Sequence, residues 1–254
     1  MKFKNIMSLV LGLSLFLFAI LSSGCTSSKF GTLTNLADKY GTDKGSENHY
    51  YTEVYEYFFL PIKHKARKIC EIGIGEGASM KMFKDYFPNA VYYGIDINDL
   101  SRLNSDTTKT FVADQANKKQ LKDFIDTYGY DFDIIIDDGG HTMEQQQVSF
   151  AYLFKYLKPG GYYIIEDVHT SLWSLCGAKY GAEENEKNTT LVAISNFIRN
   201  GGIESKYMTT EEKDYLTANI RYCDLLSRNR GNSITCIFKK NYKNTRIYGR
   251  LPGT

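Results

Sequence analysis

The alternation of short apolar strands with helical segments between residues 67 and 169 constrains the fold more than any other feature of this chain. Five stretches rich in β-branched and apolar residues are typical of buried strands: 67–73, 90–97, 109–114, 132–137 and 162–169. Helical patterns separate most of these strands: 77–87, 118–129 and 143–157. Buried strands that alternate with helices form a parallel sheet with helices on both faces. The sequence therefore predicts an α/β protein with a Rossmann-like, doubly wound sheet.

The flanking segments predict the remaining organisation. Residues 29–62 read as two helices joined by a polar loop, with Pro61 as the stop. "KPGG" at 158–161 predicts a turn before the fifth strand, and Thr142 and Gln145 predict a capping box. "NIRYCDLL" and "SITCIFKK" predict a closing hairpin, so the sheet should be mostly parallel with an antiparallel C-terminal hairpin strand. The expected divisions are an N-terminal segment at 1–28, a helical region at 29–62, one α/β domain at 63–242 and a tail at 243–254.

The first 28 residues resemble a targeting segment. A basic start, "MKFKN", precedes a 16-residue apolar run at 6–21 and then "SSGC". This pattern fits a signal peptide or a short membrane anchor. Gly24-Cys25 resembles a lipoprotein cleavage site, although Ser22 stands where an apolar residue is expected. A start written too far upstream is a further interpretation, so cleavage, lipidation, retention or absence of this segment all stay open.

Composition argues against some partners and compartments. The formal net charge is +2 and acids and bases are interspersed, so no basic stripe indicates a nucleic-acid partner. The five cysteines have no paired or zinc-type spacing, which indicates buried thiols in a reducing compartment. That compartment disagrees with an export signal at residues 1–28.

A glycine-rich turn follows the first strand. "EIGIGEGAS" places Glu71, Gly73, Gly75 and Gly77 between this strand and its helix. Glycines at such a turn let the backbone approach a ligand and direct helix amides toward it. With Ala78, the turn also matches the G-x-G-x-x-A dinucleotide fingerprint. A nucleotide-type ligand is therefore expected at this turn.

Two further acids end the second and third strands. Asp96 closes "YYGID", where a carboxylate in a doubly wound sheet faces the two hydroxyls of a ribose. Asp114 closes "FVAD", beside the expected adenine edge, although a loop cap is an equally simple role. The glycine turn and these two acids together indicate an adenosine-containing ligand.

The fourth and fifth strands end in a second group of acids. Asp138 and Glu166 are 28 residues apart, which fits one helix, one turn and one parallel strand. If the two strands are neighbours, these acids emerge at one edge about 5 Å apart. The same short region also contains four other chemically active side chains: Asp137, Asp167, His141 and His169. Crowded carboxylates need a counter-charge, for which Mg²⁺ is the simplest candidate.

These motifs resemble the class I S-adenosylmethionine-dependent methyltransferases, through "EIGIGEG" and "LKPGGYYIIED". "YGTDKG…HYY", "IDDGGH" and "IIEDVHTSLW" are similar to the metal-dependent macrolide sugar O-methyltransferases of the mycinamicin and macrocin type. Gly140 and Leu172 depart from the usual wording of that group, in which a serine and a tyrosine occur. The resemblance implies a hydroxyl methylated from S-adenosylmethionine with the help of Mg²⁺.

The resemblance also implies residue roles. The metal ligands would be Asp138, Glu166 and Asp167, and the catalytic residues His141, as base, and Asp138. The cofactor-binding residues would be Glu71, Gly73, Gly75, Gly77, Asp96 and Asp114, with Glu71 near the methionine amino group. Tyr40, Asp43, Lys44 and His49 match the group's N-terminal motif, which folds over the cofactor; their residue types alone indicate a solvated turn.

The predicted function is O-methyl transfer to a hydroxyl of a small molecule or glycan, and two alternatives stay open. One is a NAD-dependent Rossmann oxidoreductase. The other is an exported lipoprotein that uses a methyltransferase-like fold as a binding module. Because S-adenosylmethionine is a cytoplasmic metabolite, we favour a catalytic domain in the cytoplasm, with residues 6–21 as a potential membrane tether. The acceptor and the oligomeric state stay undetermined.

Overall fold

The computed structural model describes residues 31–228 and 233–243. The described residues from Thr32 onward belong to one compact unit. The predicted N-terminal segment at 1–28 and nearly all of the predicted tail at 243–254 lie outside the described residues. Within the described ranges, no helix has the length and apolar character needed to cross a membrane.

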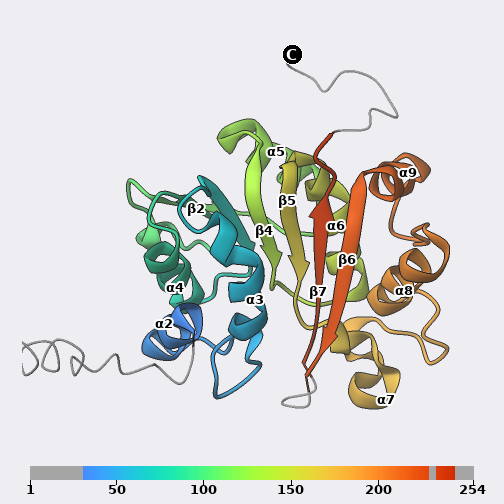
Figure 1. Ribbon diagram of the computed structural model, residues 1–254. Coiled ribbons are helices and arrows are strands. Elements are labelled where there is room, and N and C mark those ends of the chain that lie inside the picture. The colour runs from blue at the N-terminus through green and yellow to red at the C-terminus, as the bar shows by residue number, and fades with distance from the viewer. Residues whose placement is uncertain (1–30, 229–232, 244–254) are drawn as a thin grey trace, which may run out of the picture. The chain divides into compact units, whose positions relative to one another are not determined.

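A seven-stranded sheet forms the centre of the domain, in the order β3-β2-β1-β4-β5-β7-β6 (Figure 1). The strands are β1 Lys68–Ile72, β2 Val91–Asp96, β3 Thr108–Val112, β4 Phe132–Asp137, β5 Leu157–Ile165, β6 Ile220–Ser227 and β7 Ile234–Lys240. Strands β1 to β5 are parallel, whereas β7 runs antiparallel to both β5 and β6. The predicted doubly wound sheet with an antiparallel C-terminal hairpin is confirmed.

Helices cover both faces of this sheet (Figure 1). They are α2 Thr32–Tyr40, α3 Tyr51–Phe59, α4 Ala78–Tyr86, α5 Lys118–Tyr128, α6 Met143–Leu153, α7 Trp173–Cys176, α8 Thr190–Asn200 and α9 Thr210–Asn219. The capping box predicted for α6 is confirmed, since Thr142 and Gln145 bond reciprocally at its start. The sequence analysis missed α9, although Thr209 and Glu212 form the same kind of box there.

The fifth strand differs from its prediction at both ends. The segment 158–161, expected as a turn, lies inside β5, where the register with β4 shifts between Phe132 and Ile134. Residues 158–161 bulge out of the pairing with β4, which resumes at Tyr162, and Gly160 takes a φ of 77° there. The strand then ends at Ile165 because Asp167 adopts a left-handed backbone, and a 3₁₀ helix follows at Val168–Ser171.

The two core layers follow from the alternation of side chains along each strand. Ile134 and Ile136 of β4 face a layer that includes Tyr51, Tyr55 and Phe59 from α3. Ile135 faces the opposite layer. That layer is rich in aromatic side chains from helices and strands: Phe124, Phe150, Phe154, Tyr163 and Phe238. The helices of the region 29–62 therefore share a core with the sheet.

The turn after β1 packs directly on the turn after β4. Gly73 has a φ of 80°, and a Cβ at this position would lie 2.1 Å from the carbonyl oxygen of Asp138. No side chain fits at that distance. The close contact fixes the glycine-rich turn against the acidic turn.

We predict that Gly73→Ala lowers the free energy of unfolding by at least about 3 kcal/mol, because it combines backbone strain with a steric clash. Gly75→Ala is the matched control, since Gly75 also has a positive φ but no atom lies within 4 Å of its built Cβ. That control should cost only about 1 kcal/mol. Urea denaturation measures both, and equal losses would contradict the close-packing argument.

Candidate active site

The sheet register brings the two predicted acid pairs together. Asp137 of β4 pairs with Ile165 of β5, so Asp138 and Glu166 follow at the same level. The Glu166 amide donates to the Asp137 carbonyl at 2.9 Å, which continues the pairing past the strand ends. The predicted adjacency of these strands, and of their terminal acids, is confirmed.

Lys44 reaches into this group of acids from the loop between α2 and α3. Its Nζ donates to Asp138 Oδ2 and, at 2.8 Å, to Glu166 Oε2, and it lies 3.6 Å from Glu71 Oε1. The lysine is completely buried. Burial alone would lower the Lys44 pKa, but the surrounding carboxylates raise it well above its usual value. The solvated-turn interpretation is therefore wrong for Lys44.

Two tyrosines of α3 complete the contacts of the acids. Tyr55 donates its hydroxyl to Glu166 Oε1 and Tyr51 donates to Asp167 Oδ1, both at 2.7 Å. The tyrosines are four residues apart and therefore lie on the same face of the helix. The sequence analysis gave them no role, although Tyr51 ends the quoted HYY motif. The signal for both was the i, i+4 spacing on the apolar side of a helix beside the YGTDKG motif.

The acids differ in how readily they ionise. Burial raises the pKa of Asp138 and of Glu166, and Lys44 opposes this only in part. Burial also acts on Asp167, but His141 and the Tyr51 hydroxyl lower its pKa below the usual value. Asp167 is therefore the acid whose charge the site favours most.

Histidines surround Asp167. His141 Nε2 lies 3.5 Å from Asp167 Oδ2 and 3.9 Å from Asp138 Oδ1, and His169 Nδ1 lies 3.7 Å from Asp167 Oδ1. The buried Nδ1 of His141 has no hydrogen-bond partner among the described residues. His141 and Asp167 both have positive φ values, 58° and 55°. Strained backbone of this kind is common where side chains must be aimed at a ligand.

One set of potential metal ligands arises directly from this geometry. One ligand atom each from Asp138, His141 and Asp167 lie within 4.8 Å of one another. Carboxylate oxygens and an imidazole nitrogen suit a divalent cation. Glu166, which belongs to the predicted metal set, lies beside this group, and each of its oxygens already accepts one hydrogen bond.

The glycine-rich turn has the conformation that its sequence demands. Gly73, Gly75 and Gly77 all have positive φ values, and α4 begins directly after them. Asp96 Oδ2 accepts from the amides of Ile74 and Gly75 at 3.1 and 3.3 Å, so Asp96 holds the turn in place.

Glu71 lies behind this turn with one acceptor left over. Its Oε2 accepts from Ser79 Oγ at 2.9 Å and from the Tyr92 hydroxyl, and the residue is completely buried. Its Oε1 accepts no hydrogen bond from the described residues, and the Lys44 Nζ lies 3.6 Å from it. A buried carboxylate oxygen without a donor fits a cationic amino group of a ligand.

Asp114 and Asp137 have structural contacts in this state. Asp114 Oδ1 accepts from the Ala116 amide at 2.8 Å, which is the loop cap that the sequence analysis left open. Asp137 accepts from Gln115 Nε2 at 2.8 Å and from Ser149 Oγ, on the side away from Lys44. Burial raises the pKa of Asp137 to about 6.

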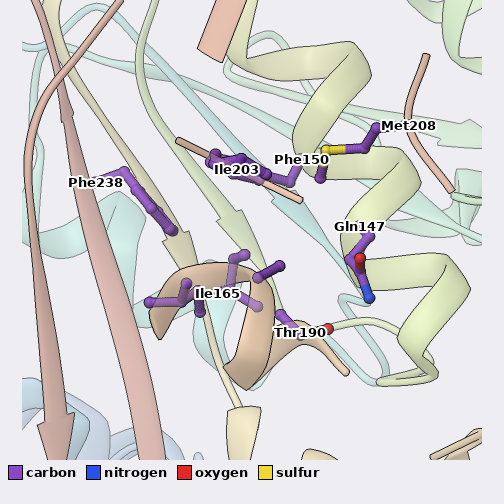
Figure 2. Close-up of a pocket in the computed structure, with 9 residues that line it drawn as sticks. Gln147, Phe150, Ile165, Thr190, Ile203, Met208 and Phe238 are labelled. Carbon is purple, nitrogen blue, oxygen red and sulfur yellow. The ribbon is translucent and has the colours of Figure 1, made fainter. Parts of the chain in front are cut away.

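A separate small pocket is lined by residues of α6, α8, β5 and β7 (Figure 2). Its lining is almost entirely apolar: Gln147, Phe150, Ile165, Thr190, Ala193, Ile194, Ile203, Met208 and Phe238. No carboxylate or histidine lines it. We interpret it as part of the packing between α6, α8 and β7.

No family model matches the chain, but individual relatives do. It is 33% identical over 202 residues to L-olivosyl-oleandolide 3-O-methyltransferase of Streptomyces antibioticus, covering 77% of this chain and 52% of that protein. It is 35% identical over 169 residues to mycinamicin VI 2''-O-methyltransferase of Micromonospora griseorubida, covering 64% and 42%. The chain thus spans about half the length of the curated relatives it matches.

A solved structure agrees. The MycE methyltransferase of the mycinamycin biosynthetic pathway, in complex with Mg, SAH and mycinamycin VI, superimposes with a TM-score of 0.69 at 27% identity, covering 89% of this chain and 58% of that one. The fold is that of the class I S-adenosylmethionine-dependent methyltransferases, whose antiparallel ending separates it from the dinucleotide-binding sheet of dehydrogenases. Within that class, the chain resembles the macrolide sugar O-methyltransferases of the mycinamicin and macrocin type.

We predict that Asp137→Asn changes how stability depends on pH. The pKa of Asp137 is about 6 in the folded protein, compared with about 3.9 when unfolded, so the wild type loses stability as pH rises through this interval. Asparagine does not titrate. Relative to wild type, the variant should therefore gain about 1 kcal/mol between pH 5 and pH 8 in urea denaturation. Asp126→Asn, at an exposed position of α5, should show no such gain; a parallel pH profile for Asp137→Asn would contradict the prediction.

Proposed function

We propose that this protein transfers a methyl group from S-adenosylmethionine to a hydroxyl of a sugar, assisted by Mg²⁺. The observation that carries the proposal is the convergence of Asp138, Asp167 and His141 beside the glycine-rich turn of a methyltransferase fold. The relatives support the acceptor class, since two of them are named as O-methyltransferases of glycosides, L-olivosyl-oleandolide and 8-demethyl-8-alpha-L-rhamnosyl tetracenomycin-C. The structural neighbour with Mg and SAH supports both cofactors.

The cofactor side of the proposal uses the turn after β1 and the ends of the next two strands. The glycines, Gly73, Gly75 and Gly77, would leave room for the ligand. Glu71 would accept from the methionine amino group through its Oε1, which accepts no hydrogen bond from the described residues. Asp96 would accept from the ribose hydroxyls with the lone pairs that the turn amides do not use, and Asp114 would lie at the adenine edge.

The metal side of the proposal uses Asp138, Glu166 and Asp167 as ligands. When bound, Mg²⁺ would lower the pKa of a coordinated sugar hydroxyl. The chain itself supplies the positioning: Tyr51 and Tyr55 fix the carboxylates of Asp167 and Glu166. Fixed geometry accounts for much of the rate of a bimolecular transfer.

His141 would take the proton from the acceptor hydroxyl. Its Nε2 faces Asp167, whose charge stabilises the protonated imidazole. The carbonyl of His141 accepts from Thr170 Oγ1 at 3.1 Å, which ties the histidine turn to the turn that contains Asp167. This hydrogen bond keeps His141 close to Asp167.

We infer that the catalytic domain faces the cytoplasm, because S-adenosylmethionine is made there. A tether through residues 6–21 and a self-associated state remain predictions. Asp138 keeps its contacts with Lys44 and His141, and Asp167 lies beside it. This intact group of side chains favours an enzyme over an exported binding module. The acceptor would be a secondary-metabolite sugar, a surface polysaccharide residue or a lipid-linked glycan.

We predict that His141→Ala lowers methyl transfer at least about 100-fold while leaving S-adenosylhomocysteine affinity unchanged. Mass spectrometry of a glycoside panel measures transfer, and calorimetry measures binding of S-adenosylhomocysteine and of Mn²⁺. Retained Mn²⁺ binding identifies His141 as the base. If Mn²⁺ binding is lost together with turnover, His141 is a ligand instead.

We also predict that chelation abolishes the activity. EDTA-treated protein should regain transfer when Mg²⁺ is added, whereas Asp138→Asn should remain inactive at any Mg²⁺ concentration because it lacks a charged ligand. Transfer that persists in EDTA would refute the metal role.

A further inference from the structure

Lys44 connects three carboxylates that belong to three different parts of the sheet. Glu71 lies in β1, Asp138 follows β4, and Glu166 follows β5. The lysine Nζ lies within 3.6 Å of an oxygen from each of them and has no exposed surface. The sequence analysis did not predict that a lysine lies between these carboxylates.

The charge of this lysine matters because Glu166 has no other cationic partner among the described residues, and Asp138 has only the more distant His141 Nε2, 3.9 Å from its Oδ1. Tyr51 and Tyr55 donate hydrogen bonds to Asp167 and Glu166 but carry no positive charge. Buried carboxylates without a counter-charge are strongly destabilising. Lys44 is therefore the cation that makes the group tolerable within the folded chain that the structure describes.

The two carboxylate oxygens of Asp138 have different partners. Lys44 occupies its Oδ2, whereas its Oδ1 faces His141 on the side where the potential metal ligands converge. The lysine and a divalent cation can therefore use different oxygens of the same carboxylate. Their positive charges would still repel each other across it.

We propose that Lys44 is a positioning residue of the cation site, whose ammonium holds Asp138 and Glu166 together and supplies part of the positive charge before a divalent cation binds. The inference rests on the proposed function in one respect: it takes the bound cation to be a divalent metal. As a consequence, the protein folds without metal, and the metal binds as an exchangeable ligand. Without the ammonium, folding itself should depend on the divalent cation.

Lys44→Met tests this, because methionine keeps most of the length of the side chain and removes the charge. In EDTA, the melting temperature should fall by about 10 °C relative to wild type. Millimolar Mn²⁺ should restore most of that loss, whereas it should raise the wild-type melting temperature much less. Calorimetry on the cofactor-free protein should show Mn²⁺ binding tightened by about tenfold or more.

Lys240→Met is the matched control. Lys240 is also completely buried, but its Nζ donates to the carbonyls of Lys155 and Leu157 and, within the described ranges, to no carboxylate. Its loss should lower the melting temperature in EDTA, and Mn²⁺ should not restore it. Equal rescue of both variants would overturn the proposal.

The double variant Lys44→Met/Glu166→Gln covers the case in which the single variant does not fold. The glutamine removes one negative charge and keeps an oxygen for the Tyr55 hydroxyl, so the double variant should melt higher in EDTA than Lys44→Met. A double variant no more stable than the single one, or a Lys44→Met protein with wild-type Mn²⁺ response, would show that Lys44 acts only through packing. A wild type that binds no Mn²⁺ would refute the metal part of the proposed function, while the EDTA comparison would still decide the role of Lys44.

Discussion

The close approach of carboxylates at the carboxyl ends of β1, β4 and β5 is the constraint on which the rest of this structure depends. A parallel sheet brings the ends of neighbouring strands to one edge, so acids placed there in sequence must meet in space. Asp138 and Glu166 meet in this way, and Glu71 lies close enough to share the same lysine. Neighbouring elements supply the contacts that stabilise these crowded carboxylates.

These contributions come from both sides of the sheet edge. From the sheet itself, Gly73 lets the turn after β1 approach the acidic turn. From outside the sheet, the loop after α2 inserts Lys44, and α3 aligns Tyr51 and Tyr55 with the acids. The acidic group is therefore contacted both by the turn after β1 and by the N-terminal segment that contains α2 and α3.

The sequence predicted those features that depend on local patterns. The strand periodicity and the spacing between Asp138 and Glu166 were enough to place these acids together, because strand register transmits position directly. The burial of Lys44 could not be predicted in the same way, since it depends on how α2 and α3 dock on the sheet. The prediction of a turn at 158–161 was wrong for a related reason: the glycines and proline there indicate a turn, but the segment lies within β5, and pairing with β4 resumes after it at Tyr162.

The position of Lys44 in the chain also bears on how the domain assembles. The lysine is separated from Asp138 by 94 residues and from Glu166 by 122, so it leaves the ribosome long before its partners exist. Contacts of such high sequence separation form late, because a long loop must close first. The N-terminal segment would therefore make its contacts with Glu166 only after β5 has joined the sheet. A fragment starting at residue 63 would carry the acids without their lysine, so we expect it to be less stable than the domain that includes the helical region.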